Sequence, residues 1–163
     1  MKFLKRSMSP AKPDRFGRIS GTTAALGLEA IGLLHAAWGF GLNLPAADRQ
    51  SLAQTVVGTN VFPSTIDCLV VAALLGVAGA IVAARANPQS RPFNTLPPIL
   101  SRVGAGTAAA ILALRGAGGL IVGALGVPAT TSTFRVLNLA IYSPLCLALA
   151  LAIQRTEGPL RRP

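Results

Sequence analysis

Charged residues are scarce in this sequence, and acidic ones especially so. Only 12% of the 163 residues are charged, with 5 acidic residues against 15 lysines and arginines. Average soluble domains carry roughly 25% charged residues. Hydrophobic residues make up 52% of the chain. This balance favours a membrane protein over a soluble domain.

Residues that build reactive centres are equally rare. Cys68 and Cys146 lie in apolar runs and form no Cys-x-x-Cys pair, which argues against a disulfide or a thiol relay. The single histidine, His35, cannot supply two axial haem ligands. No metal-ligand spacing, no glycine-rich phosphate loop with lysine and no serine–histidine–carboxylate combination is present. We therefore expect no metal, no cofactor and no enzymatic activity.

What the sequence does have is long apolar runs. They cover about 22–44, 65–84, 103–125 and 136–153. A helix needs roughly 20 residues to cross the hydrocarbon core, and a lipid-facing segment must satisfy its backbone internally. Leu52 to Val57 could add a short interfacial helix between the first two runs. The sequence predicts an all-α fold, a transmembrane four-helix bundle.

The basic residues are sorted between alternate connections. Twelve lie in the first, middle and last polar stretches: Lys2, Lys5, Arg6, Lys12, Arg15, Arg18, Arg85, Arg91, Arg102, Arg155, Arg161 and Arg162. Only Arg49 and Arg135 lie in the other two. Cytoplasmic loops carry such an excess, so both termini are predicted to be cytoplasmic.

This pattern also predicts the domain organisation, the location and the partners. A basic cytoplasmic arm (1–19) precedes a membrane domain (20–154), and a basic tail (155–163) follows it. We expect the bacterial cytoplasmic (inner) membrane. The net charge of +10 then reflects orientation and contact with anionic lipid headgroups at the cytoplasmic face, and nucleic acid is not expected as a partner.

Polar residues inside the apolar runs are the candidate functional residues. They are Glu29, His35, Arg115, Asn138 and Tyr142. A charge inside a bilayer costs several kcal/mol unless it is paired or hydrated. Because a helical side chain leans toward the helix amino terminus, Arg115 is expected to reach Glu29 and form an ion pair, with His35 and Tyr142 completing the network. Such a pair could lock two helices in register, or it could handle protons.

Two further patterns predict structural roles. Ser64 and Asp67 have the spacing of a capping box at the start of the second run. Gly32 with Ala36, and Gly119 with Gly123, are small residues four apart that let helices approach closely. The pattern leaves open whether these contacts form within one chain or in a homodimer or larger membrane complex.

Two segments carry a resemblance. They are His35-Ala-Ala-Trp-Gly-Phe-Gly and the run from Phe134 that ends in Tyr142-Ser-Pro-Leu-Cys. With Arg115-Gly-Ala-Gly, they resemble a family of small bacterial four-span membrane proteins known only as a domain of unknown function. The resemblance implies a fold and a membrane location, but no activity. In that family an acidic residue often occupies the position of Asn138, which leaves Glu29 as the partner expected for Arg115.

Three functional hypotheses follow. The first is a non-enzymatic accessory or structural bundle whose Glu29, His35 and Arg115 layer fixes helix register. The second is a small proton-coupled transporter, which could work as a dimer, with Glu29 as the proton carrier. The third is an enzyme acting on lipid, with His35 as base and Tyr142 or Arg115 binding a headgroup.

Overall fold

The computed structural model describes residues 14–87, 97–126 and 130–157, and all regular structure in these ranges is helical. The α-helices are α1 (Arg15–Gly39), α2 (Arg49–Val56), α3 (Thr65–Ala86), α4 (Pro98–Leu125), α5 (Ser132–Leu137) and α6 (Ser143–Gln154). A π-helical turn, η2 (Asn138–Tyr142), joins α5 to α6, and a 3-10 turn, η3 (Arg155–Glu157), follows α6. The all-α class expected from the sequence is confirmed.

Three helical segments are long and apolar enough to cross a membrane. They are Thr65–Ala86, Ile99–Leu125 and Ser132–Gln154, the last combining α5, η2 and α6. The chain is therefore a multi-pass membrane protein. The apolar run of α1 is interrupted by Glu29 and His35, and α1 is not among the three.

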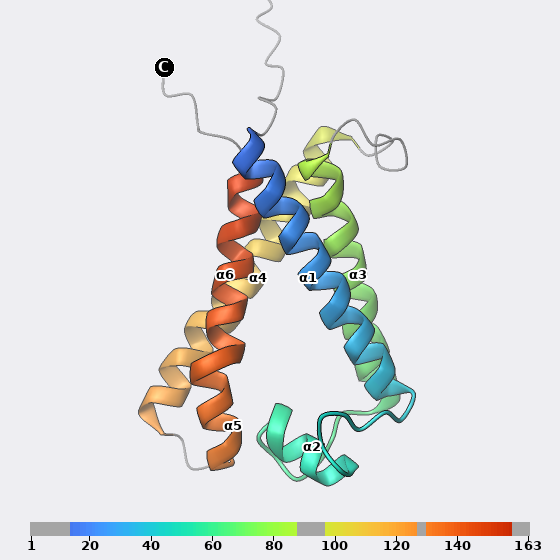
Figure 1. Ribbon diagram of the computed structural model, residues 1–163, viewed down its shortest axis with the longest axis vertical. Coiled ribbons are helices and arrows are strands. Elements are labelled where there is room, and N and C mark those ends of the chain that lie inside the picture. Colours follow the sequence, from blue (N-terminus) through green and yellow to red (C-terminus); the bar gives the residue numbers. More distant parts are fainter. Residues whose placement is uncertain (1–13, 88–96, 127–129, 158–163) are drawn as a thin grey trace, which may run out of the picture.

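The helices form two antiparallel pairs, as Figure 1 shows. In the first pair, α1 packs along α3. In the second pair, α4 packs along the fourth run, which comprises α5, η2 and α6. The pairs meet near one end and diverge toward the other, where α2 and α5 lie. The start of α1 and the end of α6 lie together at the end where the pairs meet (Figure 1).

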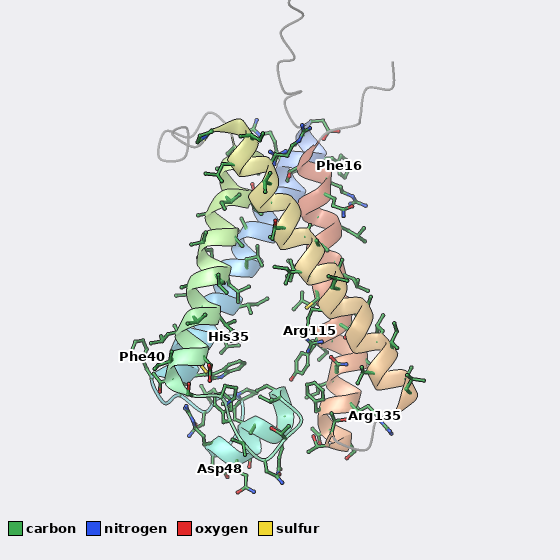
Figure 2. The ribbon with its side chains drawn as sticks, turned by 180° about the vertical axis from the view of Figure 1, so that it is seen from behind. Phe16, His35, Phe40, Asp48, Arg115 and Arg135 are labelled. Atoms are coloured by element: carbon green, nitrogen blue, oxygen red, sulfur yellow. The ribbon has the colours of Figure 1, made fainter. Side chains whose placement is uncertain are left out.

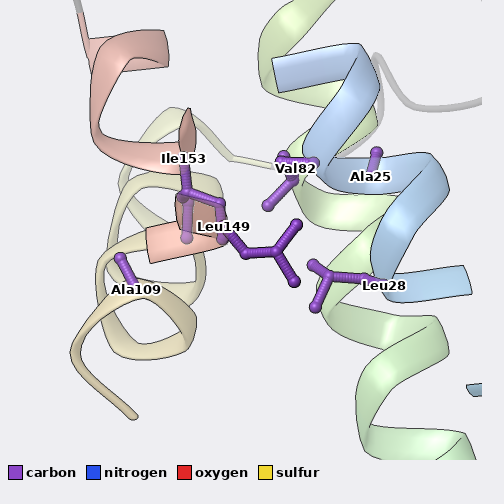
Figure 3. Packing of buried hydrophobic residues seen from close by; sticks show 8 residues of the cluster. Ala25, Leu28, Val82, Ala109, Leu149 and Ile153 are labelled. Carbon is purple, nitrogen blue, oxygen red and sulfur yellow. The ribbon is translucent and has the colours of Figure 1, made fainter. Parts of the chain in front are cut away.

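The main core lies where the two pairs meet (Figure 3). Its buried residues are Ala24, Ala25, Leu28, Val82, Ala105, Ala109, Leu149 and Ile153. Alanine supplies half of this list, and its small side chain lets the backbones approach closely. Leu28, Val82 and Leu149 then fill the volume between the pairs (Figure 3).

Truncation of Leu28 should test this core. Leu28 is 1% exposed, so Leu28→Ala leaves a cavity and should lower the free energy of unfolding by about 2–4 kcal/mol. Leu26, in the same helix, is 66% exposed, and Leu26→Ala should change it by no more than about 0.5 kcal/mol. Thermal unfolding in one detergent compares them, and equal effects would contradict the packing in Figure 3.

The helix ends differ from the expected spans because polar caps set them. α1 begins at Arg15, not near 22, since the Asp14 side chain accepts a hydrogen bond of 2.7 Å from the Gly17 N–H. It ends at Gly39, not at 44. α2 also begins earlier than the expected helix, because Asp48 caps it.

The expected terminal segments fall only partly within the described ranges. Residues 15–19 of the basic arm belong to α1, and residues 155–157 of the tail form η3. Residues 1–13 and 158–163 lie outside the described residues.

Candidate functional site

The fourth apolar run is not one regular helix. In η2 the N–H of Ser143 bonds to the carbonyl of Asn138, five residues earlier. Pro144 supplies a physical reason, because proline has no N–H and its ring clashes with the carbonyl four residues before it. Single π-turns inside α-helices often occur at functional sites. This π-turn coincides with the polar side chain that forms the most hydrogen bonds in the fourth run.

That side chain belongs to Asn138, which is 2% exposed. Its Nδ2 donates to the Gly119 carbonyl at 2.7 Å, and its Oδ1 accepts from Ser143 Oγ at 3.1 Å and from Arg115 Nη1 at 3.2 Å. We call these four residues the Asn138 network. Its hydrogen bonds connect α4 to η2 and α6, so it holds the second helix pair together.

Glycines make the close approach around this network possible. A Cβ on Gly119 would collide with Ser143 Oγ and would lie 2.7 Å from Arg115 Nη1. A Cβ on Gly123 would lie 2.7 Å from Leu139 Cδ2. In this structure, the stripe formed by Gly119 and Gly123 therefore packs against the fourth run of the same chain.

The other small-residue pair lies on α1. A Cβ on Gly32 would lie 3.2 Å from the carbonyl oxygen of Ala72 and 3.4 Å from Leu75 Cβ, so Gly32 marks the close contact of α1 with α3. Ala36, one turn further along, is half-buried.

Arg115 does not reach the partner expected for it. Its side chain runs over Gly119, toward the carboxyl end of α4, and its Nη1 donates a hydrogen bond to Asn138 Oδ1. In the described part of the chain it makes no ion pair with Glu29. The missing Cβ of Gly119 gives the guanidinium room, and the Asn138 oxygen offers an acceptor on that side. Local space and a nearby acceptor thus outweigh the usual lean toward the helix amino terminus.

Glu29 lies in the other helix pair. It is half-buried on α1, and its carboxyl group packs against Gly79 of α3, with Oε2 3.8 Å from the Cβ position of Gly76. The two glycines leave room for the carboxyl group on the α3 surface. Glu29 and Arg115 therefore belong to separate polar groups.

His35 and Trp38 lie near the carboxyl end of α1, away from the chain termini. His35 Nδ1 donates to the Ile31 carbonyl at 2.8 Å, and its ring lies 5.0 Å from that of Trp38. Trp38 is buried with Leu52 and Cys68. Its Nε1 donates to the Leu44 carbonyl at 2.7 Å.

The α1–α3 connection, residues 40–64, touches both helix pairs. Trp38 anchors it to the first pair. On the second pair, the Tyr142 hydroxyl donates to the Thr55 carbonyl at 3.3 Å, and Thr131 Oγ1 donates to the Gln54 carbonyl at 2.6 Å. Tyr142 thus lies one turn from Asn138, but it contacts α2 instead of joining the Asn138 network.

Two side-chain caps start helices at this end. Ser64 and Asp67 form the reciprocal hydrogen bonds of a capping box, as their spacing predicts. Asp48 accepts from the N–H and the hydroxyl of Ser51 at 2.8 and 3.1 Å. These hydrogen bonds lower the pKa of the Asp48 carboxyl group below its ordinary value.

Sequence reasoning did not identify Ser143, Gly116 or Thr131 as contact residues. Ser143 is fully buried and bonds to Asn138, and its place before a proline in an apolar run was the available signal. A Cβ on Gly116 would lie 2.9 Å from the Ser143 carbonyl oxygen. Thr131 caps α5 through the Phe134 N–H, a role that the Thr-Ser-Thr stretch ahead of an apolar run could have indicated.

These contacts can hold helices together and can present one guanidinium inside the bilayer. Within the described ranges, no group of three or more His, Cys, Asp or Glu side chains could hold a metal ion.

Comparison with known proteins identifies a family but no activity. The model of DUF3995, described as a protein of unknown function, matches residues 28–153. No curated protein matches the chain. No solved structure matches it either. The match covers most of the chain, so the chain belongs to the DUF3995 family.

Proposed function

We propose that this chain is a four-span protein of the bacterial cytoplasmic membrane that acts as a non-enzymatic accessory or structural component. The observation that carries the proposal is the Asn138 network. Asn138 Nδ2 and Oδ1 both bond to groups of this chain, across two helices. Interhelical hydrogen bonds and small residues are what associate helices in lipid. The proposed structural role rests on this network instead of on the Glu29, His35 and Arg115 layer expected from the sequence.

The arrangement of α1 supports four spans. α1 packs along α3 (Figure 1), so a bilayer crossed by α3 would also contain α1. The chain ends then lie on the same side, where the basic residues predict the cytoplasm. In a Cys68→Ala, Cys146→Ala background, a single cysteine at Thr133 should react from outside intact cells with a membrane-impermeant maleimide, whereas a single cysteine at Ser7, ahead of α1, should not. Reaction of both cysteines from outside would contradict four spans.

An accessory role predicts a stable assembly with other membrane proteins or with further copies of this chain. Membranes containing a tagged chain would be dissolved in mild detergents, and the mass of the eluted particle would be measured by light scattering. We expect a protein mass well above the 16.6 kDa of one chain. Recovery as a monomer in every detergent would argue against the accessory role.

Glu29 favours a second candidate, a small proton-coupled transporter. A carboxyl group within a span is a functional hypothesis by default. Glu29 is half-buried, and its carboxyl group contacts the glycine surface of α3 without a side-chain hydrogen bond to another described residue.

Proton uptake can separate the two candidates. Proteoliposomes with an imposed membrane potential and an internal pH dye would be compared for the wild type and Glu29→Gln. A transporter should acidify the lumen, and Glu29→Gln should remove at least about 90% of that rate, a tenfold loss. Equal traces from the two proteins and from empty liposomes would favour the structural role.

A further inference from the structure

Arg115 has a charge that its own chain does not neutralise within the described residues. It lies 10 residues before the end of α4, about 15 Å along the helix axis from that end. Arginine stays protonated at any physiological pH, and placing it at this depth costs several kcal/mol unless it is paired or hydrated. Its hydrogen-bond partner, Asn138, is neutral and accepts from one of the five N–H groups of the guanidinium.

The guanidinium is nevertheless accessible. Arg115 is exposed, whereas the Asn138 side chain that it contacts is buried. Figure 2 shows Arg115 on the side of its helix pair that faces the other pair, at about the height of His35. The remaining N–H groups of the guanidinium are thus presented between the diverging pairs.

The surroundings determine how a partner could reach it. Toward the termini, the pairs close on the core around Leu28 and Leu149 (Figure 3). Toward the other end, the α1–α3 connection contacts both pairs through Trp38 and Tyr142. Sideways, from the bilayer, the approach passes apolar side chains such as Ile111, which lies one turn before Arg115 and is 61% exposed. A partner that enters this way needs an apolar part as well as a negative charge.

We propose that Arg115 binds the phosphate or carboxylate headgroup of an anionic amphiphile that enters from the bilayer between the two helix pairs. Guanidinium matches both headgroups with two parallel hydrogen bonds. Asn138 holds the guanidinium in place, and the π-turn at Asn138 is the kind of distortion found at functional sites. This binding site goes beyond the structural role proposed above.

The test is a thermal-shift titration of the full chain in a nonionic detergent. The probes are dodecyl phosphate, dodecanoate, dodecanol with the same tail but no charge, and inorganic phosphate with no tail. Near saturation, dodecyl phosphate and dodecanoate should raise the Tm of the wild type by about 5 °C or more. Dodecanol and inorganic phosphate should leave it unchanged.

Matched variants assign the effect to one residue. Arg115→Gln should weaken dodecyl phosphate binding at least about tenfold, and Arg135→Gln, which removes an exposed arginine from α5, should leave it unchanged. If Arg115→Gln does not fold, Arg115→Lys keeps the charge without the two-pronged geometry and should bind more weakly than the wild type.

Four outcomes would overturn the proposal. One is no shift of the wild type with dodecyl phosphate. The second is an equal shift in Arg115→Gln, or in Arg115→Lys where that variant replaces it. A shift as large with inorganic phosphate would indicate a soluble anion instead of an amphiphile. A shift as large with dodecanol would indicate binding of the tail alone.

Discussion

Replacement of Gly116 by alanine should destabilise the protein by about 2–3 kcal/mol, the upper part of the usual range of about 1–3 kcal/mol for overpacking a tight contact. The new Cβ would lie 2.7 Å from Leu147 Cγ and 2.9 Å from the Ser143 carbonyl oxygen. The leucine could change rotamer, but the carbonyl belongs to the first turn of α6 and cannot move alone. Relief therefore requires α4 and α6 to separate.

Gly118 provides a matched control in the same helix. A Cβ there has nothing within 4 Å. Gly118→Ala should therefore leave stability unchanged or raise it by up to about 1 kcal/mol, because alanine favours the helix over glycine. Unfolding midpoints of both variants in the same detergent give the comparison. Similar midpoints for both would mean that α4 and α6 do not pack through Gly116.

The helices were predictable from sequence because their causes are local. Apolar runs of sufficient length predicted α3, α4 and the fourth run, and the Ser64 to Asp67 spacing predicted a cap that the structure contains. α1 begins earlier than its apolar run because the Gly17 N–H donates a hydrogen bond to the Asp14 side chain. Both residues precede that run, so the run alone did not predict this start.

The contacts of Arg115 were not predictable in the same way. Counting residues gives the depth of a side chain along a helix, and on that basis Glu29 was within reach. Contact also depends on the rotation and tilt of each helix, and one residue of error rotates a side chain by about 100°. Here the pairs diverge, so Glu29 faces α3 while Arg115 bonds to Asn138. Only the three-dimensional arrangement separates residues of similar depth.

Asn138→Leu should also cost about 2–3 kcal/mol of unfolding free energy. It removes three hydrogen bonds and leaves the Gly119 carbonyl and the Ser143 hydroxyl without this partner. An interhelical hydrogen bond in lipid contributes about 0.6 kcal/mol on average, but a polar group left unsatisfied costs about 1–3 kcal/mol. The size of the effect therefore comes from the groups that lose Asn138, and those groups lie on both α4 and α6.

Asn138→Asp keeps the hydrogen-bond acceptor of this side chain and removes its hydrogen-bond donor. The carboxylate can still accept from Arg115 and Ser143, and it gains attraction to the guanidinium, but it cannot donate to the Gly119 carbonyl. We expect it to lose less than half of the stability that Asn138→Leu loses, measured by thermal unfolding in the same detergent.

A double-mutant cycle of Asn138→Leu with Arg115→Gln should show coupling of about 1 kcal/mol, because the two residues are in direct contact. If the effects of the two substitutions were additive and Asn138→Leu unfolded at the wild-type midpoint, the Asn138 network would no longer support a structural role.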